Sequence, residues 1–314
     1  TDNGDIDFSW NSVADGFYYR IQVDDSNSFS TPIYDQTITS TSIDYFHFIN
    51  DDEYFWRVKA KDDAGNWGSW SAVWDFKVDT LPPSPPEYIS PLTDSFINDN
   101  SPLICWDNIP DATYYHLEID LFPTFYSPVV DAYITDNFYQ CIELPEGDYY
   151  WRIQSIDDVP NYGGWGPTWH FVIDTLQPNA PSIVSPNDNA LINDLYPRLE
   201  WSQISNIETY HIQIDTDSSF TSLLLNLTSG LDPYYDVSIV LPEFEPIFWR
   251  VRAIDEAGNI GNWGGIWQFE IDAHPPTNPI LLSPNNNSIF NNPTPTLRWQ
   301  TVSTAVNYEI MIDD

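Results

Sequence analysis

The most obvious shortage in this 314-residue sequence is of basic residues. Ten Lys and Arg stand against 47 Asp and Glu, which gives a formal net charge of −37. Because such a surface repels phosphate backbones and anionic headgroups, the composition argues against nucleic acid or a membrane as a partner. The sequence also has no apolar run long enough to span a bilayer, and its first residues lack a signal-peptide pattern. We therefore expect a mature portion, or an excised piece, of a longer protein.

Catalytic and cofactor-binding motifs are also missing. The sequence contains no G-x-S-x-G, H-E-x-x-H, P-loop or G-x-G-x-x-G motif. Its five histidines are not spaced as metal ligands or as partners of a nucleophile. We therefore expect no enzymatic activity in this part of the protein.

Tryptophan, in contrast, is abundant and recurs at a nearly fixed interval. The sequence holds 14 tryptophans within a hydrophobic content of 42%, so it can bury enough apolar surface to fold. Two series recur every 95 to 98 residues: Trp10, Trp106, Trp201 and Trp299, and Trp56, Trp151 and Trp249. An interval of this size corresponds to one whole domain rather than to a short solenoid repeat.

Copies of one sequence phrase show where each repeat ends. The phrase reads YFWRVKAKDDAGNWGSW from Tyr54, YYWRIQSIDDVPNYGGW from Tyr149 and IFWRVRAIDEAGNIGNW from Ile247. A strand-like segment and a proline-bearing linker follow each copy. We predict module one over residues 1–80, module two over 81–175, module three over 176–273 and a partial fourth repeat, the C-terminal segment, over 274–314.

Within a module, apolar and polar residues alternate with a period of two. Tyr149, Trp151 and Ile153 alternate with Tyr150 and Arg152, which is typical of half-buried strands. Six or seven such strands fit between linkers, separated by Pro, Asn, Asp and Gly, and no segment of 12 residues has helical spacing. The pattern predicts an all-β chain made of β-sandwiches.

The motifs within the modules resemble those of fibronectin type III repeats. The resemblance rests on ICWDNIPDATYYHLEI from Ile104, LPEGDYYWRIQSIDD from Leu144, IQIDTDSSF from Ile212 and DDAGNWGSW from Asp62, and it covers nearly the whole chain. It is closest to the tandem repeats of bacterial and archaeal surface proteins. It implies an elongated tandem array of fibronectin type III-like β-sandwich domains. The integrin-binding Arg-Gly-Asp of some members is absent.

The two ends of the sequence differ from a complete module. Module one begins at its Trp10 strand, with no first strand before it, whereas residues 274–314 carry a first strand, the Trp299 strand and the start of a third. A segment dedicated to completing module one would need to supply only the missing strand, yet residues 295–314 duplicate residues 5–25. We therefore interpret the chain as a window from a longer array.

Acidic loops that recur in the modules are candidate calcium sites. Pairs of acids precede an asparagine at a fixed spacing, and Ca²⁺ binds carboxylate and amide oxygens. Aspartates that end the last strands are expected to face the same linkers. The candidate ligands are Asp157, Asp158 and Asn161; Asp255, Glu256 and Asn259; and Asp79 and Asp174. The alternative is that each loop is a polar turn whose Asp and Asn side chains bond their own backbone. Monovalent salt would then screen the repulsion between the carboxylates at the linkers.

Loop aromatic residues are candidates for stacking on a sugar ring. Thirteen tryptophans recur as module-building residues, of which the loop members are predicted to fold over the sandwich end or a linker. Trp67 has no tryptophan counterpart. The candidate glycan-stacking residues are Trp67, Trp70, Tyr162 and Trp165.

The only two cysteines, Cys105 and Cys141, both lie in module two. They are predicted to face outward on neighbouring strands, where a disulfide would indicate an oxidising compartment. Two reduced thiols are the alternative. The triplets that begin at Asn226 and Asn286 match N-glycosylation sites of the same compartment.

One arginine in each module is predicted to pair across neighbouring strands. Arg152 should face Glu118, Arg57 should face Gln22 or Asp24, and Arg250 should face Gln213 or Asp215. An exposed pair of this kind contributes about 0 to 1 kcal/mol.

These observations predict a non-enzymatic extracellular structural or adhesive protein, a stalk or fibre of a microbial cell surface. At about 3.3 Å per strand residue, three modules in a row would span roughly 100 Å. The expected partners are the neighbouring repeats and other copies in a fibre or surface layer. A glycan- or cell-binding module, or the accessory repeats of a secreted hydrolase, are the alternatives.

Overall fold

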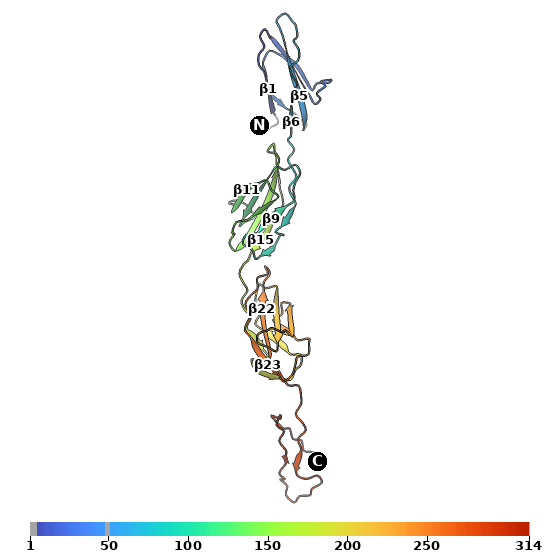
Figure 1. Cartoon of the computed structure of the whole chain (residues 1–314), viewed down its shortest axis with the longest axis vertical. Helices are drawn as coiled ribbons and strands as arrows, with labels where there is room; N and C mark the ends of the chain where they lie inside the picture. The colour runs from blue at the N-terminus through green and yellow to red at the C-terminus, as the bar shows by residue number, and fades with distance from the viewer. Residues whose placement is uncertain (1–4, 48–50, 314) are drawn as a thin grey trace. The chain divides into compact units, whose positions relative to one another are not determined.

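The structure, a computed structural model, describes residues 5–47 and 51–313, and they form strands joined by turns with no helix among them (Figure 1). Accordingly, the described residues hold no helix that could cross a membrane. The all-β prediction is confirmed. The chain divides into two compact units, Thr1–Asp174 and Thr175–Asp314.

Module one consists of two sheets. Its strands are β1 (Asp5–Ser9), β2 (Tyr18–Asp24), β3 (Tyr34–Ile38), β4 (Ser42–His47), β5 (Asp52–Lys61) and β6 (Trp74–Val78). One sheet has the order β3-β2-β5-β6 and the other pairs β1 with β4. Alternate residues of these strands meet in a core that includes Phe8, Ile21, Val23 and Tyr54.

Module two adds a first strand in two parts to the same plan. Its strands are β7 (Tyr88–Ser90), β8 (Ser95–Ile97), β9 (Leu103–Trp106), β10 (Tyr114–Asp120), β11 (Val130–Ile134), β12 (Phe138–Gln140), β13 (Gly147–Ile156), β14 (Tyr162–Trp165) and β15 (Trp169–Ile173). The larger sheet has the order β11-β10-β13-β15-β8, with β14 on β13, and the smaller has the order β12-β9-β7. The two halves of the first strand therefore form an edge strand of each sheet. In the smaller sheet β7 pairs antiparallel with β9, and in the larger sheet β8 pairs parallel with β15.

Module three repeats this order. Its strands are β16 (Ile183–Ser185), β17 (Ala190–Ile192), β18 (Arg198–Trp201), β19 (Thr209–Asp215), β20 (Leu225–Ser229), β21 (Tyr234–Asp236), β22 (Ile247–Ile254) and β23 (Trp267–Ile271). The sheets are β17-β23-β22-β19-β20 and β16-β18-β21. Trp106 and Trp201 are equivalent, as are Trp151 and Trp249, and each is 3% exposed or less, so in modules two and three both tryptophan series belong to the cores.

The C-terminal segment begins a fourth copy of the same plan. Its two short strands, β24 (Leu281–Ser283) and β25 (Arg298–Trp299), pair with Leu281 opposite Trp299. The same register places Tyr88 opposite Trp106 and Ile183 opposite Trp201.

The predicted disulfide between Cys105 and Cys141 is wrong, since both are free thiols. Cys105 pairs with Phe138 across β9 and β12, whereas Cys141 lies beyond β12, where its N–H donates to the carbonyl of Pro102. Cys141 also faces inward, into the core of module two, and is 3% exposed. The two side chains therefore lie at different positions along the paired strands and point to different faces of the sheet. Burial also raises the pKa of the Cys141 thiol to about 12.

Candidate functional site

The outer face of the larger sheet carries one arginine per module, held between two aromatic rings. The guanidinium carbon of Arg57 lies 4.0 Å from the ring centre of Phe29 and 4.3 Å from that of Trp70. The values are 4.2 and 4.1 Å for Arg152 with Phe125 and Trp165, and 4.0 and 4.3 Å for Arg250 with Phe220 and Trp263. The loop tryptophans therefore lie over the outer sheet face, and the prediction that they fold over a sandwich end or linker is wrong.

In modules two and three, a buried aspartate at the end of the third strand of the sandwich, Asp120 or Asp215, accepts hydrogen bonds from the turn that carries the phenylalanine of the stack. In module three, the carboxylate of Asp215 accepts hydrogen bonds from the N–H groups of Asp217 and Ser222, at 3.3 and 3.0 Å. Within this turn Phe220 has a φ of 55°, in the left-handed region, and the equivalent Phe29 and Phe125 have 50° and 51°. The turn thereby directs the ring back over the arginine of the neighbouring strand.

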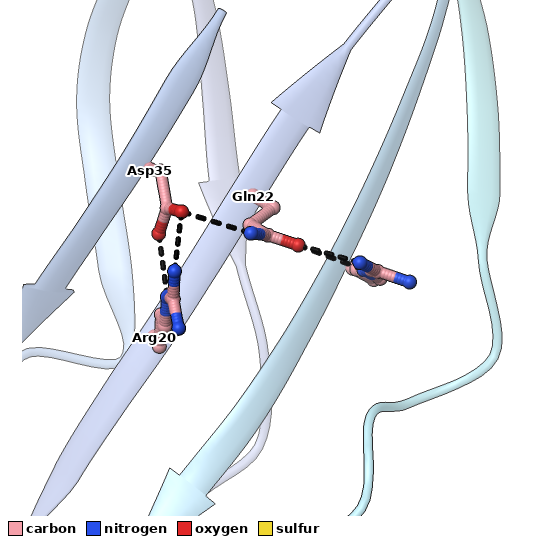
Figure 2. Close-up of polar contacts among 4 residues, drawn as sticks. Arg20, Gln22 and Asp35 are labelled. Atoms are coloured by element: carbon pink, nitrogen blue, oxygen red, sulfur yellow. Dashed lines mark hydrogen bonds and ion pairs between the residues drawn. The ribbon is translucent and has the colours of Figure 1, made fainter. Parts of the chain in front are cut away.

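A chain of polar contacts runs beside the stack of module one (Figure 2). Arg57 donates to the amide oxygen of Gln22 at 2.7 and 3.0 Å, and Gln22 donates to Asp35 at 2.8 Å. Arg20 donates to both carboxylate oxygens of Asp35 at 2.6 Å. The hydrogen bond from Arg20 lowers the pKa of Asp35, and the desolvation of Arg57 lowers the pKa of that guanidinium.

Equivalent contacts occur in the other two modules. Arg152 donates to Glu118 at 2.7 Å and forms an ion pair with it at 2.6 Å. Arg250 donates to the amide oxygen of Gln213 at 2.5 and 2.8 Å. The three cross-strand arginine pairs predicted from the sequence are thus confirmed, including the strand register from which they follow.

Module one alone adds two lysines to this face. Lys59 Nζ lies 4.9 Å from the ring centre of Trp67 and 4.6 Å from that of Trp70, and Lys61 Nζ lies 5.5 Å from Trp67. The equivalent residues of module two are Gln154 and Ile156. Four of the ten basic residues of the chain therefore gather around two tryptophans, which we call the basic aromatic patch: Arg20, Arg57, Lys59, Lys61, Trp67 and Trp70.

The residues predicted to stack on sugar fall into two groups. Trp70 and Trp165 are half-buried and each has a ring face against an arginine. Trp67 and Tyr162 are 38% and 54% exposed. Sugar stacking stays a prediction, and the exposed pair is better placed for it.

The loop of module two that was predicted to bind calcium is closed by its own hydrogen bonds. One oxygen of Asp157 accepts from the N–H groups of Val159 and Asn161, and the other accepts from the Asn161 amide at 2.9 Å. Asp158 is exposed. Asp79 approaches this loop through its backbone carbonyl, which accepts from the Asn161 amide at 3.0 Å.

The loop of module three has the same internal bonds. Asn259 donates to both carboxylate oxygens of Asp255, at 2.7 and 3.0 Å. For Glu256 and Asp174, as for the rest of the set, calcium binding stays a prediction.

Two other groups of side chains in the described part of the chain have metal-ligand geometry. One is His116, Glu118 and Asp131, and the other is Glu243, Asp272 and His274. In the first, Glu118 is already paired with Arg152, and His116 contacts Asp131 at 2.7 Å. These contacts hold the residues of the first group close together.

Both predicted glycosylation asparagines are exposed. The side-chain oxygen of Asn226, on β20, contacts His211 at 2.7 Å and accepts from Gln213 at 3.2 Å. Asn286 lies in the turn after β24. Glycosylation stays a prediction at both.

Sequence reasoning missed the phenylalanine of each stack. The available signal was a hydroxyl residue followed by phenylalanine at the same place in each module: Ser28-Phe29, Thr124-Phe125 and Ser219-Phe220. An alternation pattern does not single these residues out, because they lie in turns.

No protein-family model and no curated protein matches the chain. Among solved structures, the FN1–FN3 domains of chicken CNTN1 have 14% identity and a TM-score of 0.41, over 85% of this chain and 93% of that one. The fibronectin(III)-like modules of Clostridium thermocellum CbhA have 11% identity and a TM-score of 0.41, over 59% and 93%. Because both identities and both TM-scores are low, the assignment of the fold as a fibronectin type III-like sandwich rests on the strand order of modules two and three.

Proposed function

We propose that the chain is a non-enzymatic spacer of an extracellular or cell-surface protein, a stalk or fibre built from fibronectin type III-like modules. Such modules occur typically in extracellular proteins and are generally not catalytic. In this role the modules supply length, and the linkers limit bending.

The attachment of the linker between modules one and two is the observation that carries this proposal. At its start, Asp51 accepts hydrogen bonds from the N–H and the hydroxyl of Thr80, both at 2.8 Å. From module two, the Ser155 hydroxyl donates to the carbonyl of Ser84 at 2.6 Å, and the Asn161 amide donates to the carbonyl of Asp79, just before Thr80. A proline-rich linker bonded in this way loses much of its freedom to bend.

Two neighbouring glycines show how closely the linker approaches module two. A Cβ at Gly163 would collide with the carbonyl of Pro83, whereas a Cβ at Gly164 would meet nothing within 4 Å. In module three a Cβ at the equivalent Gly261 would lie 2.7 Å from the carbonyl of Pro178. The close approach therefore recurs, and it requires a residue without a side chain.

The test compares Gly163→Leu with Gly164→Leu by small-angle scattering of the whole chain. We expect Gly163→Leu to displace the linker and broaden the distribution of interatomic distances, and Gly164→Leu to leave it unchanged. A wild-type profile that already fits freely jointed modules, and that Gly163→Leu does not alter, would contradict the spacer proposal.

The basic aromatic patch favours glycan binding as a second candidate function. Lys59 and Lys61 lie near the ring of Trp67, which is 38% exposed, in a chain that is otherwise strongly acidic. This combination is suited to an acidic sugar. The variant Lys59→Gln/Lys61→Ile carries the residues of module two at these positions and so suits the fold. Calorimetry with uronic-acid oligosaccharides should show binding to the wild type and a loss in this variant. No heat of binding to the wild type would exclude this function.

A further inference from the structure

Modules one and three each bind the start of the following linker with an acidic residue from the turn before β5 or β22. In module one this residue is Asp51, which accepts from both the N–H and the hydroxyl of Thr80. In module three it is Glu243, whose Oε2 accepts from the N–H of Ala273 at 2.9 Å. Ala273 stands where module one has Thr80, so the hydroxyl donor of module one has no counterpart in module three.

The next residue of module three, His274, brings an imidazole to the same carboxylate. Its Nδ1 lies 3.0 Å from Oε2 of Glu243, and its backbone N–H donates to Oδ1 of Asp272 at 3.1 Å. The three side chains each offer a ligand atom, and these atoms all lie within 4.8 Å of one another. Modules one and two have Leu81 and Leu176 at the position of His274, so the fold does not require a histidine there.

The ring of Phe244 limits how the imidazole of His274 can turn. The two ring centres are 5.3 Å apart, and the ring planes are inclined by 34°. Phe244 has a φ of 63°, in the left-handed region, where a bulky side chain is strained. Module two has Gly147 directly after Glu146, at the place where Phe244 follows the acid of module three. Contact with a neighbouring ring of this kind orients a ligand side chain before it binds.

The donor atoms of this group select zinc rather than calcium. An imidazole nitrogen and two carboxylates are ordinary ligands of Zn²⁺, whereas Ca²⁺ takes six to eight oxygen atoms. Bonds of about 2.0–2.2 Å to a tetrahedral zinc ion place neighbouring ligand atoms about 3.3 Å apart. Nδ1 of His274 and Oε2 of Glu243, at 3.0 Å, are already close to this separation. A zinc ion can therefore bind both atoms after a small movement, with Asp272 as the third ligand and water as the fourth.

The charges around the group also favour a cation. Among the ion pairs of the described residues, none joins Glu243 or Asp272 to a lysine or arginine. The group of His116, Glu118 and Asp131 differs in this respect, because Arg152 pairs with Glu118 at 2.6 Å and its charge would repel an ion. Two carboxylates without a basic partner, in a chain with a net charge of −37, attract divalent cations.

We propose that module three binds a zinc ion through Glu243, Asp272 and His274, at the point where β23 leads into the following linker. One ligand comes from the turn before β22 and two come from the start of the linker. The ion would therefore hold the start of this linker against module three, where module one uses the hydroxyl of Thr80. The proposal goes beyond the spacer function and does not depend on it.

The first experiment is calorimetry of the full chain, purified without a histidine tag, with zinc chloride. We expect one site that binds zinc more tightly than the surface carboxylates do. His274→Leu, which places the residue of modules one and two here, should weaken this site by about 100-fold or more, since losing a residue that only orients a ligand already costs about 10–100-fold. Millimolar calcium should not displace the zinc.

The control for the first experiment is His116→Arg. It removes the histidine of the other group and places there the residue of module one, Arg20, so we expect it to leave the tight zinc site unchanged. Equal zinc titrations of the wild type and His274→Leu would overturn the proposal. Loss of the tight site in His116→Arg would also overturn it, because zinc would then bind to module two.

The second experiment tests the coordination with cobalt(II) in place of zinc. A four-coordinate cobalt ion absorbs visible light much more strongly than a six-coordinate one, so the spectrum reports the geometry of the site. We expect a visible band in the wild type that zinc abolishes by competition and that is absent in His274→Leu. An equal band in His274→Leu would show that the imidazole is not a ligand and would refute the site.

Small-angle scattering in the presence of chelator separates this proposal from the spacer function, because it reports the bending of the linkers without metal. A chain with stiff linkers and no tight zinc site would overturn the zinc proposal alone. A chain with a tight zinc site and freely jointed modules would overturn the spacer function alone.

Discussion

The cross-strand pair of module two allows a quantitative test of how the stacked arginines stabilise the fold. Replacing Arg152 by Met keeps the aliphatic packing between Phe125 and Trp165 but removes the charge. The carboxylate of Glu118, whose side chain is 12% exposed, then loses its cation. Breaking a buried pair from one side costs about 3–5 kcal/mol, and a cation–π contact contributes about 1 kcal/mol. Because the side chain of Arg152 is 26% exposed, solvent screens the pair and we expect about 3 kcal/mol in total.

The companion variant is Glu118→Gln, which places the residue of modules one and three at this position, Gln22 and Gln213. Its own cost should be at most about 1 kcal/mol, since the amide oxygen still accepts from the guanidinium, as in those modules. In the double variant no buried carboxylate is left unpaired. We therefore expect Arg152→Met/Glu118→Gln to be about 1 kcal/mol more stable than Arg152→Met, although it carries one more substitution.

A chain of several modules does not unfold in one step, so the assay must report module two alone. The thiol of Cys141 does so, because it is 3% exposed and the two cysteines of the chain both lie in this module. Thiol labelling at increasing urea concentrations, read by mass spectrometry, gives the free energy of opening of module two. A double variant that is less stable than Arg152→Met would refute the reasoning, because the cost would then lie in lost packing rather than in the unpaired carboxylate.

Three further predictions use the same chain. Asp35→Asn should lower the stability of module one at neutral pH and weaken the dependence of that stability on pH in acid, both measured by hydrogen exchange. The lowered pKa of Asp35 stabilises the fold above the ordinary value of 3.8, and this stabilisation is lost as the pH falls below it. An unchanged loss of stability in acid would contradict this. Intact mass without reductant should show two free thiols, of which native iodoacetamide at pH 8 modifies Cys105 first; a mass two hydrogens lower would restore the disulfide. If the acidic loops bind calcium, millimolar calcium should raise the melting temperature relative to chelator; no change in melting temperature or scattering would remove the metal.

Much of the fold follows from the sequence because strand alternation and the domain-length repeat carry the same information. The pairing of Arg152 with Glu118 could be predicted, since a period of two places both side chains on the face opposite the one that buries Trp151, on strands that are neighbours in the known order. The prediction that Cys141 faces outward is wrong because it relied on the same alternation outside a strand. Cys141 lies after the end of β12, where the chain leaves the ladder and alternation no longer indicates which side chain points inward.

The candidate sites could be predicted less well, because they depend on turns. The sequence placed Asp157 and Asn161 in one loop but did not reveal that their side chains bond to each other. It likewise placed Trp165 in a loop without showing that the left-handed turn at Phe125 leaves an arginine to stack on. Turn geometry depends on a few φ angles and on local hydrogen bonds, and neither leaves a periodic pattern.

The three modules also serve as controls for one another, which separates structural residues from candidates for specific function. The arginine between two rings is present in all three and therefore belongs to the scaffold. Residues that differ at equivalent positions are not required by the fold. Ser71 is the clearest example, because modules two and three have glycine there: a Cβ at Gly166 would collide with Tyr88 of β7, and a Cβ at Gly264 would collide with the carbonyl of Pro181, just before β16. A side chain at this position therefore makes a contact that the other modules lack, since the hydroxyl of Ser71 accepts a hydrogen bond from the N–H of Val58 at 3.1 Å.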